Sequence, residues 1–232
     1  PFTHLRYLCP QAIDYAVETR SNNCWFVEWG GGYYYPDLFA QKRENRWELL
    51  AAHARRVGNV MSETGVDTLG VIVMDIDSPE AMRAYEVIAG EVPGLLGIVA
   101  MQYAPYEGGE GEVFQVKGQR GGMVPVICAS YSLWNNTTRP RSGTPAKVAR
   151  LLGSEAVYDS GPTPAWVSVH AWSFFKQSEE SGDRDEDMPQ EQAAAQGGVR
   201  GLTPAGWCVD RLPKRVRVVS PQEMLWRVRT KR

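Results

Sequence analysis

Residues 68–90, TLGVIVMDIDSPEAMRAYEVIAG, place two kinds of pattern in immediate succession. The first nine residues are almost continuously apolar, which is typical of a strand covered on both faces in a parallel sheet. Ser78 and Pro79 then supply a helix N-cap and a favoured first helical residue, and an amphipathic run follows. The stretch therefore predicts a strand followed by a helix, which is the βα unit of α/β proteins.

The same order of elements recurs along the rest of the chain. Strand-like apolar runs lie at 24–29, 68–76, 95–103, 124–131, 165–172 and 215–220, and helical patterns lie at 10–20, 45–63, 78–90, 144–153 and 220–229. Two later helices also begin with Ser/Thr-Pro, at Thr144 and Ser220. We therefore expect an α/β fold with mostly parallel strands, either a doubly wound sheet or part of a (β/α) barrel.

The barrel is the favoured version of this fold. No GxGxxG or GxxxxGK(S/T) motif follows a predicted strand, which argues against a nucleotide-binding sheet. A complete barrel has about 250 residues, whereas this chain has 232 and starts with a predicted helix. We expect a single (β/α)-barrel-like domain over 1–232 that lacks its first βα units, with an acidic loop insertion at 177–198. Because the sequence begins at Pro1, we expect a processed product or a fragment.

Composition excludes several classes of function. The net charge of −2 and the pI near 6.0 give no reason to expect nucleic-acid binding, and no apolar run approaches the length of a membrane span. The four cysteines are scattered and never form CxxC, and the chain has three histidines. We therefore expect no zinc motif, no metal site and no cofactor. The oligomeric state stays open.

Acidic and aromatic side chains follow the predicted strands. In parallel architectures, sites gather at the carboxyl ends of the strands. The acids that come there are Glu28, Asp75, Asp77 and Glu107, and the aromatic or imidazole side chains are Tyr103, Trp134, His170 and Trp172. Sugars offer C–H faces to aromatic rings and hydroxyls to carboxylates, and glycoside hydrolysis uses two carboxyl groups. This mixture favours a carbohydrate site.

Each of these candidates also has a structural alternative. Asp77 lies beside the start of a helix, where a negative charge is favourable, and Glu107 lies in a glycine-rich loop that is typical of solvated surface. His170 lies inside an apolar strand, where a satisfied core histidine is as common as a ligand. Glu28 lies between Val27 and Trp29, where a buried acid is costly unless it is paired.

The stretch VEWGGGYYYPD, residues 27–37, combines three glycines with three tyrosines. Glycine allows positive φ and close approach to a ligand, and in an extended run Tyr33 and Tyr35 share one face while Tyr34 lies on the other. The spelling Gly30-x-Gly32-Tyr33-x-Tyr35-Pro36 resembles the signature of the GxGYxYP family of proposed glycoside hydrolases. The resemblance implies a (β/α)-barrel-like domain, a role in polysaccharide degradation and an extracellular or periplasmic location.

Together, the residues and the resemblance predict a glycoside hydrolase that acts on a polysaccharide or oligosaccharide. Glu28 and one of Asp75, Asp77 or Glu107 are expected to form the carboxyl pair. The expected substrate-binding residues are Gly30, Gly32, Tyr33, Tyr35, Tyr103, Trp134, His170 and Trp172. Two alternatives remain open, which are a non-catalytic carbohydrate-binding protein and a metal-dependent carbohydrate deacetylase that uses His170.

Overall fold

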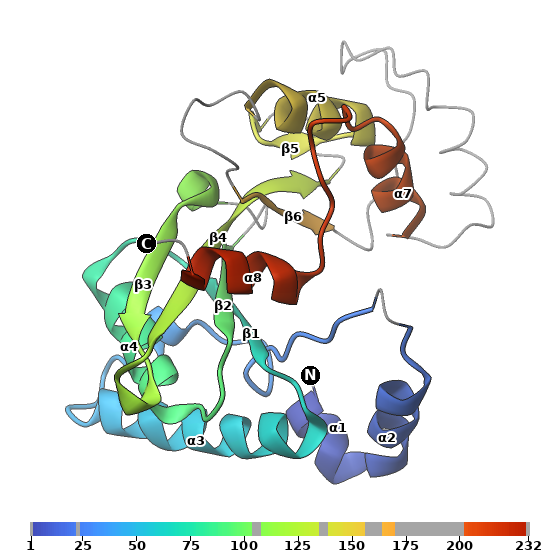
Figure 1. The fold of residues 1–232 in the computed structure, drawn as a ribbon. Coiled ribbons are helices and arrows are strands. Elements are labelled where there is room, and N and C mark those ends of the chain that lie inside the picture. The colour runs from blue at the N-terminus through green and yellow to red at the C-terminus, as the bar shows by residue number, and fades with distance from the viewer. Residues whose placement is uncertain are drawn as a thin grey trace. The chain divides into compact units, whose positions relative to one another are not determined.

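The computed structural model describes residues 2–21, 24–103, 108–134, 139–155, 164–169 and 202–230 (Figure 1). These residues belong to two compact units. The first comprises Pro1–Tyr103, Glu112–Cys128 and Val219–Arg232, and the second comprises Ala104–Gly111 and Ala129–Val218. The second unit is therefore inserted into the sequence of the first.

A mostly parallel sheet forms the centre of the first unit. Strands β1 (Thr68–Val73), β2 (Gly97–Gln102) and the start of β4 (Met123–Leu133) run parallel in that order. Strand β3 (Val113–Lys117) pairs antiparallel with β4. The parallel strands are apolar and almost entirely buried, which is the property expected of strands covered on both faces.

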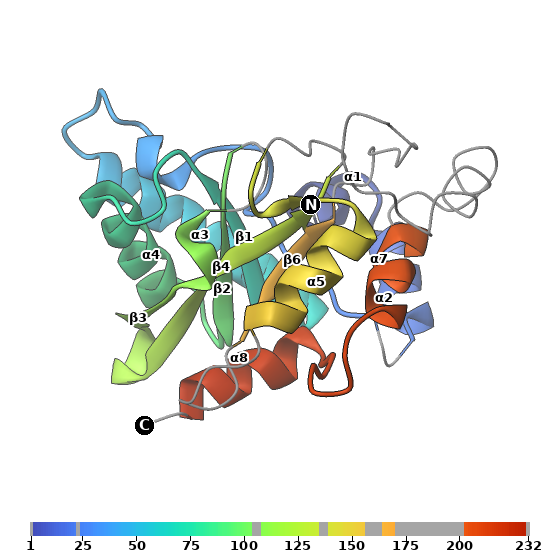
Figure 2. The ribbon, with the colours of Figure 1, turned by 90° about the horizontal axis from the view of Figure 1, so that it is seen from above.

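Helices cover this sheet on both faces. Alternate strand residues such as Leu69, Ile98 and Val126 pack in one core with helices α3 (Arg46–Thr64) and α4 (Pro79–Glu91). On the other face, Leu225 of α8 (Pro221–Thr230) lies against Gly97 of β2. Figure 2 shows α3 and α4 on one side of β1 and β2, and α8 on the other.

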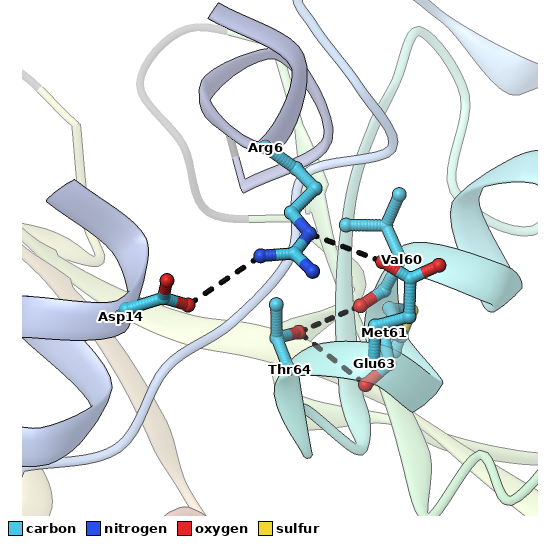
Figure 3. Close-up of polar contacts among 6 residues, drawn as sticks. All are labelled: Arg6, Asp14, Val60, Met61, Glu63 and Thr64. Carbon is cyan, nitrogen blue, oxygen red and sulfur yellow. Dashed lines mark hydrogen bonds and ion pairs between the residues drawn. The ribbon is translucent and has the colours of Figure 1, made fainter. Parts of the chain in front are cut away.

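Two short helices precede the sheet, α1 (Phe2–Leu8) and α2 (Pro10–Thr19). Arg6 of α1 lies between Asp14 of α2 and Glu63 of α3, at 3.4 Å and 3.1 Å respectively (Figure 3). Beside it, the Thr64 hydroxyl donates to the Val60 carbonyl at 2.8 Å. Because Arg6, Asp14 and Glu63 are partly or largely exposed, these ion pairs stabilise the helix contacts only weakly.

The second unit has its own strands and its own core. The end of β4 pairs with β5 (Ser142–Gly143) and with β6 (Trp166–Val169), both in parallel. Helices α5 (Pro145–Glu155) and α7 (Leu202–Asp210) contribute to its core, which includes Tyr131, Leu133, Val148, Ala149 and Cys208. Short 3-10 turns lie at Pro36–Leu38, Gly109–Gly111 and Gln119–Gly121.

The structure confirms a mixed α/β fold with a six-stranded, mostly parallel sheet. Among the described residues, β1 and β3 are the edges of the first unit's sheet, so this sheet does not close into a barrel. Two predicted strands are wrong. Residues 24–29 form a single bridge pair, Glu28 with Leu69, and residues 215–220 are irregular.

Among the described α-helices and strands, α1, α7, β3 and β5 were not predicted. The predicted acidic insertion at 177–198 lies outside the described residues. In the part of the chain that the structure describes, no helix is both long and apolar enough to cross a membrane.

Candidate functional site

Three tyrosine rings lie together in the first unit. The ring of Tyr35 is 6.0 Å from that of Tyr33 and 5.7 Å from that of Tyr103, and Tyr33 and Tyr103 are 6.3 Å apart, centroid to centroid. All three pairs meet edge to face, which is a favourable geometry for aromatic rings. Tyr33 is 62% exposed and Tyr103 is 44% exposed, so the tyrosine cluster presents ring surface to solvent.

The ends of two neighbouring parallel strands bring these tyrosines together. Tyr103 follows β2, and its N–H donates to the carbonyl of Val73, the last residue of β1, at 2.9 Å. Asp37 fastens the Gly-Tyr segment to the same place, because its Oδ2 accepts from the N–H groups of Met74 at 2.8 Å and Asp75 at 3.4 Å. The cluster therefore lies at the carboxyl end of the sheet, where parallel folds place their sites.

Tyr34 lies on the inner face of the same segment. Its ring is 5.6 Å from Phe39 and 5.0 Å from His53, both edge to face. Burial, and then the charge of Glu28, raise the pKa of the Tyr34 phenol far above its ordinary value, so this group stays protonated. Tyr33 and Tyr35 contact Tyr103, whereas Tyr34 contacts Phe39 and His53, and this division is the alternation predicted for an extended run.

The glycines of the motif shape the turn before the tyrosines. Gly30 has φ +67° and Gly32 has φ +156°. A Cβ on Gly30 would lie 2.6 Å from Cε1 of Tyr34, so the missing side chain lets the ring pack against the backbone. The His53 Nε2–H donates to the carbonyl of Gly30 at 2.7 Å, which fixes the turn on helix α3. Gly30 and Gly32 therefore position the tyrosine cluster through the backbone.

Glu28 is fully buried beneath this turn. Its Oε1 accepts from the N–H of Gly31 at 2.8 Å, and its Oε2 accepts from the N–H of Thr3 at 3.2 Å. Thr3 is in the first turn of α1, where backbone N–H groups have no partner within the helix. These donors compensate the burial of the carboxyl group, so Glu28 has a clear structural role as an anchor between α1, the glycine turn and β1.

Asp75 and Asp77 follow β1 as an exposed pair. Desolvation, a hydrogen bond with Asp77 and the charge of Asp77 raise the pKa of Asp75, with smaller contributions from Asp37 and Glu80. A neighbouring negative charge favours the protonated form of a carboxyl group. Asp75 therefore keeps its proton to a higher pH than an isolated aspartate does.

We expect Asp77→Asn to lower the pKa of Asp75, because the substitution removes the neighbouring negative charge. Since the folded protein raises this pKa, the free energy of unfolding decreases as the pH rises through it, and the substitution should reduce that decrease. Carboxyl-carbon NMR titration of Asp75 measures the shift directly. Glu80→Gln is the control and should give a smaller shift, while an unchanged pKa in Asp77→Asn would contradict the coupling.

The other predicted site residues lie elsewhere. Trp134 is half-buried in the second unit, directly after β4. Glu107, His170 and Trp172 lie outside the described residues. Among the residues that the structure describes, no three or more Cys, His, Asp or Glu side chains gather in a way that would hold a metal ion.

Asp37 is a buried acid of this region that was not among the predicted site residues. It is 3% exposed, and its Oδ1 has no hydrogen-bond partner, although Oδ2 accepts two backbone N–H groups. The sequence offered one signal for Asp37, which is its position directly after Tyr35-Pro36 of the motif. An acid that is buried there needs hydrogen-bond donors from other parts of the chain.

No family model matches this chain, and no curated protein or solved structure is similar enough to count as a match.

Proposed function

We propose that the tyrosine cluster and the Asp75–Asp77 pair bind a carbohydrate, and that the protein hydrolyses a glycosidic bond there. The observation that carries the proposal is the exposed cluster of Tyr33, Tyr35 and Tyr103 at the carboxyl end of β1 and β2. Exposed aromatic surface at such an edge suits the C–H face of a sugar ring, and nearby carboxylates suit its hydroxyls.

The roles in hydrolysis follow from the environments of the acids. Asp75 is assigned as proton donor, because its neighbours raise its pKa above the ordinary value. Glycosidases place their second carboxyl group about 5–9.5 Å away. Both Glu28 oxygens are engaged by backbone N–H groups in the interior. Glu28 is therefore poorly suited to this second role, and Glu107, the remaining acid selected in the sequence, lies outside the described residues.

The proposal includes the resemblance to the GxGYxYP family and its (β/α)-barrel-like fold. The motif residues Tyr33 and Tyr35 contribute two of the three rings, and β1, α4 and β2 form a parallel βαβ unit. An enzyme that degrades polysaccharides needs exposed aromatic surface of this kind to bind sugar rings. The extracellular or periplasmic location belongs to the same proposal.

Tyr33→Ala should weaken sugar binding at least about fivefold, corresponding to about 1 kcal/mol for one lost ring contact. Calorimetric titration with short neutral oligosaccharides of glucose, xylose, mannose and galactose would identify a ligand and measure the loss. Tyr15→Ala is the matched control, since Tyr15 is 69% exposed on α2 and outside the cluster. Equal affinity of both variants, or no binding by the parent protein, would count against the site.

Non-catalytic binding is the second candidate. It is favoured by the burial of Glu28, whose two oxygens accept from backbone N–H groups, because the described residues then offer no clear second carboxyl group for a glycosidase. Chromatography of the bound oligosaccharide after long incubation separates the two candidates. Shortened products that disappear in Asp75→Asn support hydrolysis, whereas retained affinity with an intact ligand supports binding alone.

A further inference from the structure

The three rings of the tyrosine cluster stand nearly perpendicular to one another. The interplanar angle is 82° between Tyr33 and Tyr35, 84° between Tyr33 and Tyr103, and 89° between Tyr35 and Tyr103. The cluster is therefore not one flat platform, because its ring faces point in three directions. A flat sugar ring can stack on one such face, whereas a compact, rounded group can contact more than one. The face of an aromatic ring attracts cations, and rings arranged around an ammonium group are a recognised way to bind it.

Four carboxyl groups belong to the same end of the sheet as the tyrosine cluster. They are those of Asp37, Asp75, Asp77 and Glu80. Asp37 follows Tyr35 by two residues, and its Oδ2 accepts from the N–H of Asp75. Two residues span at most about 7 Å, which is within the Debye length of about 8 Å at physiological salt. The attraction of these acids therefore reaches a cation that binds on the cluster.

The described residues place no ion pair on these acids. No described Lys or Arg side chain pairs with any of the four carboxyl groups. Arg46 contacts the same segment, but its guanidinium donates to the backbone carbonyl of Asp37. The N-terminus of α4 stabilises the charges of Asp77 and Glu80, which is their structural value. Desolvation and the neighbouring acids nevertheless raise the pKa of Asp75, so negative charge prevails at this edge.

We propose that the tyrosine cluster binds an organic ammonium group, and that the sugar of the proposed function is a protonated amino sugar. The ring faces and the acids both attract a positive charge, whereas a neutral sugar gains nothing from the charge of the site. In its amino-sugar form the inference rests on the function proposed above. Choline offers the same ammonium chemistry without a sugar, and it is the second source of the group to be tested.

The first experiment titrates the whole protein with four ligands by calorimetry at about pH 6, where free amines are protonated and most carboxyl groups are ionised. The ligands are choline and three disaccharides of the same linkage, built from glucosamine, N-acetylglucosamine or glucose. We expect the glucosamine disaccharide to bind at least about tenfold more tightly than the two neutral ones, because it alone carries charge. This preference should shrink as the salt concentration rises.

The four ligands separate this inference from the proposed function. Equal affinity for the charged and the neutral disaccharides overturns the inference and leaves the carbohydrate site standing. Binding of choline without any disaccharide supports the ammonium site and counts against the carbohydrate. No binding of any of the four ligands overturns both.

Tyr33→Leu tests the ring face, because leucine keeps apolar surface but has no aromatic face. Tyr33 is 62% exposed, so thermal unfolding should stay close to that of the parent protein. The preference for the glucosamine over the N-acetylglucosamine disaccharide should fall at least about threefold. Tyr15→Leu is the matched control on α2 and should keep the preference. An unchanged preference in Tyr33→Leu overturns recognition of the cation by the rings.

Asp77→Asn tests the contribution of the acids. It should weaken binding of the glucosamine disaccharide about threefold and leave binding of the N-acetylglucosamine disaccharide unchanged, because only the first ligand is attracted by the lost charge. Glu18→Gln is the matched control, since it removes an exposed charge from α2. Unfolding would weaken both ligands by the same factor, so the ratio of the two affinities does not depend on stability. An unchanged ratio in Asp77→Asn counts against the proposal.

Discussion

Glu28→Ala is expected to lower the free energy of unfolding by at least about 3 kcal/mol. The carboxyl group is fully buried and accepts from two backbone N–H groups, those of Thr3 and Gly31. Alanine leaves both donors without a partner and opens a cavity, and each buried unsatisfied donor costs about 1–3 kcal/mol. Denaturant unfolding measures the loss. Hydrogen exchange should show that protection of α1 falls first, since Thr3 lies in its first turn.

Glu28→Gln separates the anchor from the catalytic role expected from the sequence. The amide keeps the shape and one acceptor oxygen, so we expect a smaller loss of stability and sugar hydrolysis that falls only as far as the folded fraction falls. Glu63→Gln is the control, because Glu63 also holds α1, through Arg6, but at the exposed surface. It should change the stability by less than about 1 kcal/mol. A stable Glu28→Gln protein that binds sugar without hydrolysing it would instead establish a catalytic role.

Gly30→Ala is the second substitution with a large expected effect, a loss of about 3 kcal/mol in stability together with weaker sugar binding. Its φ of +67° costs an alanine about 1–2 kcal/mol. In addition, the new Cβ would lie 2.6 Å from Cε1 and 2.8 Å from the hydroxyl of Tyr34. Since Tyr34 packs against Phe39 and His53, its ring cannot move without disturbing them, and such overpacking costs about 1–3 kcal/mol.

Gly65→Ala isolates the two parts of this effect. Gly65 has nearly the same φ, +66°, at the end of α3, but nothing lies within 4 Å of its missing Cβ. It should therefore show the backbone strain alone, and the difference between the variants in thermal or denaturant unfolding measures the contact with Tyr34. Equal losses in both variants would show that Tyr34 does not restrict Gly30.

Local signals predicted the helices well, because their information is contained in neighbouring residues. At Ser78, Thr144 and Ser220 the side-chain oxygen accepts from the backbone N–H three residues later, at 3.2, 3.3 and 3.1 Å. Each of these residues precedes a proline at the first helical position. A cap of this kind needs no distant partner, so the sequence alone is enough to place it.

Strands depend on partners along their whole length, and two apolar runs had no such partner. The backbone of residues 24–29 hydrogen-bonds to β1 at Glu28, whose N–H donates to Thr68 and whose carbonyl accepts from Gly70. Gly30 then turns the chain away at positive φ. Residues 215–220 alternate like a strand, yet Val218 is 60% exposed and Arg215 holds the end of α5. The alternation of apolar and polar residues shows that a segment could form a strand. It does not show whether the edge of a sheet is available to pair with that segment.

Part of the candidate site could be predicted from the sequence, and part of it depends on distant partners. Tyr33, Tyr35 and Tyr103 meet because parallel neighbours end at one edge, which is a rule of topology that sequence reasoning can use. The environment of Glu28 could not be predicted from the sequence. One of its two hydrogen-bond donors is the N–H of Thr3 in α1, and the residues of α1 show no clear helical pattern. The burial of Asp37 depends in the same way on Met74 and Asp75, far along the chain.

The position of α8 in the sequence has a consequence for how the chain assembles during synthesis. Leu225 is fully buried and occupies the space that a side chain on Gly97 of β2 would fill. A ribosome must produce the whole inserted unit before α8 can emerge. Until then the backbone of β2 at Gly97 lacks its apolar partner, so the nascent chain exposes an apolar surface there that a chaperone can bind.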